Sequence, residues 1–137
     1  MTTTAKRLIE RSLVLIGAIA AGESASADSA RDGLESLNDM IHGWAKEGAD
    51  FGHQTLALGD TLQMHDSFIE GIRFNLSVRL APEYGMPVPE WISKKAIDTF
   101  LAFQAHLLEF PDDLRLDRML DPRYFSRRTG AYNIDNS

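Results

Sequence analysis

Apolar residues recur at helical spacing in four separate segments, and this pattern constrains the fold more than any other feature of the sequence. In the clearest segment the repeat consists of Leu34, Leu37, Ile41 and Trp44. Residues that recur every three or four positions lie on one face of an α-helix, whereas a half-buried strand needs strict alternation. The chain of 137 residues has the length of one domain. The pattern therefore predicts an all-α fold built on a four-helix domain.

Glycines and candidate caps set the expected bounds of the first two helices. The first is expected over about residues 5–19, with Gly22 available to end it. It is apolar nearly all round, so we expect the domain or a neighbouring subunit to cover more than one side. The second is expected to begin with Asp28 or a Ser29 capping box and to end at Gly48.

Two glycines, Gly33 and Gly43, fall inside the expected second helix. An interior glycine costs a helix about 1 kcal/mol relative to alanine. Either these are tolerated surface positions, or they allow a neighbouring helix to approach closely. The sequence leaves both interpretations open.

The second half of the domain is punctuated by prolines. The third helix is expected over 66–80, with a Ser67 capping box. The fourth is expected between Pro89 and Pro111. Residues 49–64 lose helical periodicity, which predicts an extended loop or short hairpin between the second and third helices.

The last part of the chain differs in composition from the rest. Residues 111–137 contain five Asp and five Arg but no Lys or Glu, so the net charge of −6 belongs entirely to residues 1–110. We therefore expect a helical domain over 1–110 and an extended C-terminal arm over 111–137. Arginine and tyrosine dominate binding hot spots, although a frayed, solvated terminus remains an alternative. The expected partner-binding residues of this arm are Arg123, Tyr124, Phe125, Arg127, Arg128 and Tyr132.

No motif in the sequence specifies a reactive centre. The chain has no cysteine, and its four histidines lack metal-ligand spacing. No nucleophile-elbow, dinucleotide-binding or phosphate-loop pattern occurs. We therefore predict no enzymatic activity, no catalytic or metal-binding residue and no cofactor. Asn75 and Arg79 are expected to have structural roles, with Arg79 binding acidic groups of the second helix.

Three ordered blocks of sequence resemble a known family. They read A-x-x-L-I-x-x-S-L-x-x-I-G from residue 5, L-E-x-L-N-x-M-I-x-x-W-x-x-E-G from residue 34, and N-L-x-x-R-L-A-P-E-Y-G from residue 75. Together they are similar to the head-to-tail adaptor proteins of tailed bacteriophages, also called head-completion, tail accessory or packaged-DNA-stabilisation proteins. The resemblance covers about residues 5–109 and matches the arm only loosely.

The resemblance implies a structural virion protein at the head–tail junction, assembled in the host cytoplasm. Copies would form a ring, expected to be a dodecamer, and would bind the portal protein at one end and the next tail component, a nozzle or tail adaptor, at the other. Double-stranded DNA would pass through without sequence-specific binding, and no membrane would be involved. Residues expected to pack the core or the subunit contacts are Leu34, Leu37, Ile41, Trp44, Leu76, Leu80 and Tyr84.

Other functions remain open at this stage. One is a virion-associated cell-wall hydrolase, which would need two carboxylates in one cleft. Another is an exported helical protein, because Lys6 and Arg7 precede an apolar run from Leu13 to Ala21 and a small-residue site at residues 25–27. A DNA-binding module is disfavoured by the negative charge.

Overall fold

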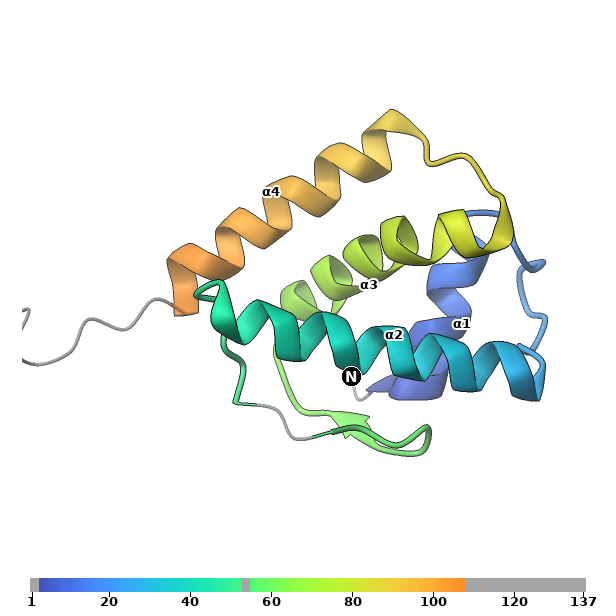
Figure 1. The fold of residues 1–137 in the computed structure, drawn as a ribbon, viewed down its shortest axis with the longest axis horizontal. Coiled ribbons are helices and arrows are strands. Elements are labelled where there is room, and N and C mark those ends of the chain that lie inside the picture. The colour runs from blue at the N-terminus through green and yellow to red at the C-terminus, as the bar shows by residue number, and fades with distance from the viewer. Residues whose placement is uncertain (1–2, 53–54, 108–137) are drawn as a thin grey trace, which may run out of the picture. The chain divides into compact units, whose positions relative to one another are not determined.

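The computed structural model describes residues 3–52 and 55–107, which belong to the unit Met1–Leu107. The helices of this part are α1 (Ala5–Leu15), α2 (Ala27–Lys46), α3 (Asp66–Leu80) and α4 (Glu90–Leu107) (Figure 1). The predicted all-α, four-helix class is confirmed. The expected arm over 111–137, with its six predicted partner-binding residues, lies outside the described residues.

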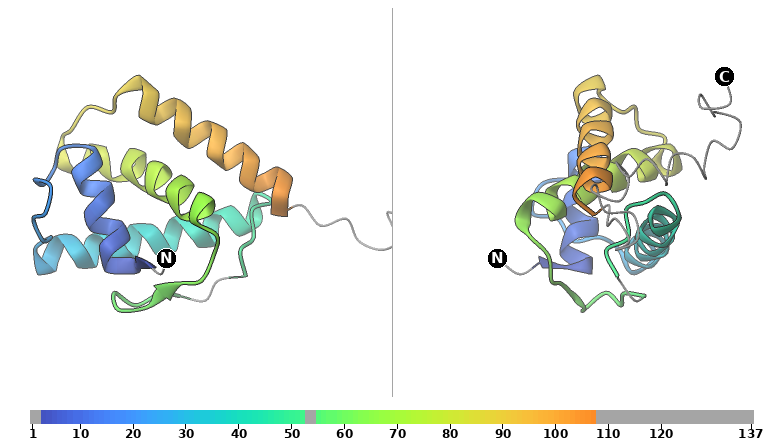
Figure 2. Two further views of the ribbon diagram at one scale, coloured as in Figure 1. Left: turned by 180° about the vertical axis from the view of Figure 1, so that it is seen from behind. Right: turned by 90° about the vertical axis from the view of Figure 1, so that its left-hand side faces the viewer.

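Helix α3 occupies the centre of the domain. It packs against α1, α2 and α4 and continues into a 3-10 turn, η1 (Ala81–Tyr84) (Figures 1 and 2). Its predicted bounds are confirmed, but its N-cap is His65 rather than Ser67, because His65 Nδ1 accepts a hydrogen bond of 3.2 Å from the Ser67 N–H. Contact on several sides explains why α3 buries residues on more than one of its faces, among them Ile69 and Phe74.

Helix α1 is shorter than predicted, because it ends at Leu15 instead of continuing to residue 19. Gly17 adopts a left-handed backbone conformation with φ of 77°. The Gly17 N–H then donates to the Val14 carbonyl at 3.0 Å, and the Ala18 N–H donates to the Leu13 carbonyl at 2.9 Å. These two bonds form a Schellman motif, which closes the helix before Gly22 is reached.

Helix α1 is covered by its own domain, since it packs against both α2 and α3. Two buried serines allow α1 and α3 to approach closely. Ser77 Oγ donates to the Ser12 carbonyl at 3.1 Å, while Ser12 Oγ donates to the Leu8 carbonyl at 2.8 Å. Both buried hydroxyls therefore have hydrogen-bond partners on the main chain, so the contact between α1 and α3 needs no larger polar side chain.

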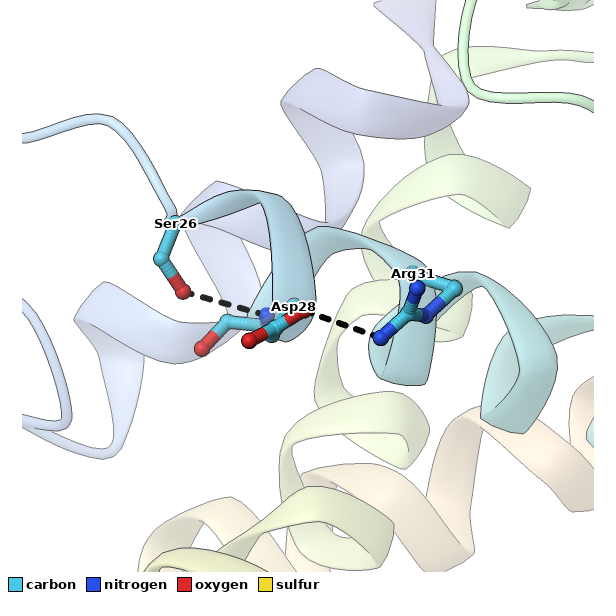
Figure 3. Close-up of polar contacts among 4 residues, drawn as sticks. Ser26, Asp28 and Arg31 are labelled. Carbon is cyan, nitrogen blue, oxygen red and sulfur yellow. Dashed lines mark hydrogen bonds and ion pairs between the residues drawn. The ribbon is translucent and has the colours of Figure 1, made fainter.

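Helix α2 begins earlier than predicted, because its N-cap is Ser26 (Figure 3). Ser26 Oγ accepts a hydrogen bond of 3.1 Å from the Ser29 N–H, and Asp28 pairs with Arg31 at 2.9 Å within the first turn. The predicted role of Gly48 is confirmed, since it follows the last turn with φ of 88°.

The two interior glycines of α2 differ. Gly33 is buried, and a Cβ there would lie 2.5 Å from Ile9 Cγ2 on α1. Gly43 is exposed, and nothing would lie within 4 Å of its Cβ. Gly33 therefore permits a close helix contact, whereas Gly43 is a tolerated surface glycine.

The described part of the segment between α2 and α3 is extended, but it does not form the hairpin that was one of the two alternatives. Its strand β2 (Thr61–Leu62) pairs antiparallel with β1 (Thr3–Thr4), which directly precedes α1. The Ala5 N–H also donates to the Asp60 carbonyl at 2.9 Å. The loop thus satisfies backbone donors of the first turn of α1, which have no partners within the helix.

An aromatic cluster fills the core where α2, α3 and α4 meet. The Phe103 ring lies 5.6 Å from Trp44, 5.3 Å from Phe51 and 5.4 Å from Phe68, measured between centroids. His106 lies 5.1 Å from Phe68 at the edge of this cluster. Tilted and edge-on rings at these distances stabilise a core beyond the area they bury.

Candidate functional site

The part of the chain that the structure describes has no group of three His, Cys, Asp or Glu side chains placed to hold a metal ion. Nor is any helix within that part long and apolar enough to cross a membrane. The described histidines contact local partners: His42 Nε2 lies 3.3 Å from Thr55 Oγ1, and His65 caps α3. The features most suited to binding another molecule are surface patches.

The first patch is formed by Arg7 and Arg11 on α1 and Arg73 on α3, and we name it the arginine face. Arg7 and Arg11 are exposed one turn apart, while Arg73 is half-buried. Two adjoining hollows, of about 270 and 250 Å³, both have Arg11 and Arg73 in their walls. Arg7 also lines the second hollow.

The arginine face shares its two hollows with acidic side chains, because Asp66 and Glu70 line the first and Glu10 and Glu23 line the second. Burial lowers the pKa of the Arg73 guanidinium, the nearby charge of Arg11 lowers it further, and Glu70 acts in the opposite direction. Arg73 Nε is buried and has no hydrogen-bond partner within residues 3–52 and 55–107. The ion pairs of this part of the chain, Lys6–Glu10 and Asp28–Arg31, involve none of the three arginines.

Aromatic contact provides part of the environment of Arg73. Its guanidinium carbon lies 5.3 Å from the centroid of the Phe74 ring, within cation–π range. This contact does not supply an acceptor for the buried Nε, which has none among the described residues. A carboxylate or another oxyanion is the group that guanidinium N–H donors bind best.

The second patch is an apolar stripe on α4, formed by Ile97 and Leu101. Their side chains are 61% and 56% exposed, whereas Ile92 and Phe103 on another side of α4 are buried. The sequence left two alternatives for the first helix, cover by its own domain or by a neighbouring subunit. The structure shows α1 covered by α2 and α3 of the same domain, and the exposed apolar pair lies on α4.

The seven residues predicted to pack the core or the subunit contacts all lie in or against the core of the domain. Five are buried, while Leu34 and Tyr84 are partly buried against the same cluster. Sequence analysis did not identify the arginine face. The spacing of Arg7 and Arg11 indicates a shared side of one helix, but no sequence signal places Arg73 beside them.

Two polar residues of α3 connect it to its neighbours. Asn75 Nδ2 donates to the Ala96 carbonyl and to Thr99 Oγ1, both at 3.1 Å. Arg79 Nη1 lies 3.5 Å from the Ser36 carbonyl of α2. The predicted partner of Arg79 was an acidic group, but the observed acceptor is a main-chain oxygen.

The sequence blocks that carry the family resemblance meet in space. The block at 34–48 forms most of α2, the block at 75–85 covers the end of α3 and η1, and both contribute to one core cluster. In comparison with known proteins, no family model matches the chain and no curated protein matches it.

Proposed function

We propose that this chain is a structural virion protein whose copies form a ring between the portal of a DNA-filled bacteriophage head and the tail. The observation that supports this best is the packing of the resembling blocks into one unit. Leu37 and Trp44 from the first block share a core cluster with Leu76 and Leu80 from the second. The residues that carry the resemblance therefore pack against one another in the folded domain.

A subunit of such a ring needs two different contact patches, because a head-to-tail ring uses one surface of each copy against another surface of the next. The arginine face and the exposed apolar pair of α4 are candidate patches. Their residues come from different helices, α1 and α3 for one and α4 for the other. The domain thus offers more contact surface than its own core uses.

The charge of the chain suits a DNA conduit. Residues 1–110 carry a net charge of −6, which repels a phosphate backbone. DNA could then pass through the ring and be retained in the head without being bound by its sequence. In this proposal the arm over 111–137 reaches the portal, and Arg123, Tyr124 and Arg128 supply hot spots there.

The two alternative functions, a cell-wall hydrolase and an exported helical protein, predict different experimental results. A hydrolase with paired carboxylates should release cell-wall fragments in a turnover assay with the purified protein. An exported protein whose mature form begins near Asp28 would lose Leu8, Ile9 and Leu13, which are buried in the core. Mass determination of the native N-terminus would detect that form.

The proposal is tested by mixing the full chain with DNA-filled heads that carry their portal but lack a tail. We expect the protein to sediment with the heads and to appear as a ring below the portal by electron microscopy. Deleting residues 122–137 should abolish this binding while the helical signal of the domain is retained. Undiminished binding by the deleted form would remove the role of the arm, and failure of the full chain to bind portal-bearing heads would refute the function.

A further inference from the structure

We draw no further inference here: the strongest candidate, the apolar patch that Ile97 and Leu101 form on the solvent-exposed side of α4, carries none because nothing among the described residues shows what covers it.

Discussion

Helices α3 and α4 approach each other closely at Gly71, and replacing it with alanine should test the packing of the core. A Cβ on Gly71 would overlap the Phe103 ring and would lie 2.9 Å from Thr99 Cβ. Neither neighbour moves easily. Phe103 is only 2% exposed and is surrounded by other aromatic rings, and the Thr99 hydroxyl donates to the Lys95 carbonyl at 2.7 Å.

The size of the effect follows from two opposing terms. Overpacking a close-packed core costs about 1–3 kcal/mol, and two constrained neighbours place this site near the upper end. Replacing a helical glycine with alanine stabilises the helix by about 1 kcal/mol. Gly71→Ala should therefore lower the free energy of unfolding by about 2 kcal/mol, which corresponds to a fall in Tm of about 8–16 °C for a domain of this size.

Gly43→Ala is the matched control, because it makes the same change on an exposed turn of α2 with nothing within 4 Å. It should raise the free energy of unfolding by up to about 1 kcal/mol. Thermal and urea unfolding, followed by circular dichroism, measure both variants. In a double-mutant cycle with Phe103→Leu, the cost of Gly71→Ala should become smaller, since the smaller side chain leaves room for the added methyl group. A Gly71→Ala variant as stable as Gly43→Ala would refute the reasoning.

Three further substitutions test other contacts. Ser26→Ala should cost about 1 kcal/mol by removing the cap of α2, whereas Ser24→Ala, at an exposed position before the helix, should have almost no effect on urea unfolding. Asn75→Ala should cost about 1–3 kcal/mol, because it removes the hydrogen bonds from α3 to α4, and an unchanged urea midpoint would contradict this. Ile97→Ser with Leu101→Ser should change stability by no more than about 0.5 kcal/mol per site, and a larger loss would mean that the pair belongs to the core of the domain.

Features that depend on one helix could be predicted from the sequence. The bounds of α3 follow from its apolar repeat and from the proline after it, and the end of α2 follows from Gly48. Where several neighbouring residues can perform the same local role, the prediction was wrong. Ser26, Asp28 and Ser29 can all cap a helix, and both Gly17 and Gly22 can adopt the left-handed conformation that ends one.

Features that depend on how helices pair could not be predicted. The environment of Arg73 exists because α3 packs against α1, which lies about 60 residues earlier in the chain. Hydrophobic periodicity shows which face of a helix is buried but not against which partner. For the same reason the sequence left open whether the domain or a neighbouring subunit covers α1, and it did not identify the exposed apolar pair on α4.

The dependence of α1 on α3 has a consequence for synthesis of the chain. The Ser77 hydroxyl bonds to the Ser12 carbonyl, and β1 pairs with β2, so the first residues made find their partners near the middle of the sequence. While the ribosome has released only α1 and α2, the apolar side of α1 that packs against α3 in the folded domain is exposed to solvent. A nascent chain that stops before residue 66 should therefore be prone to chaperone binding and proteolysis, and the domain should fold only after α3 has left the exit tunnel.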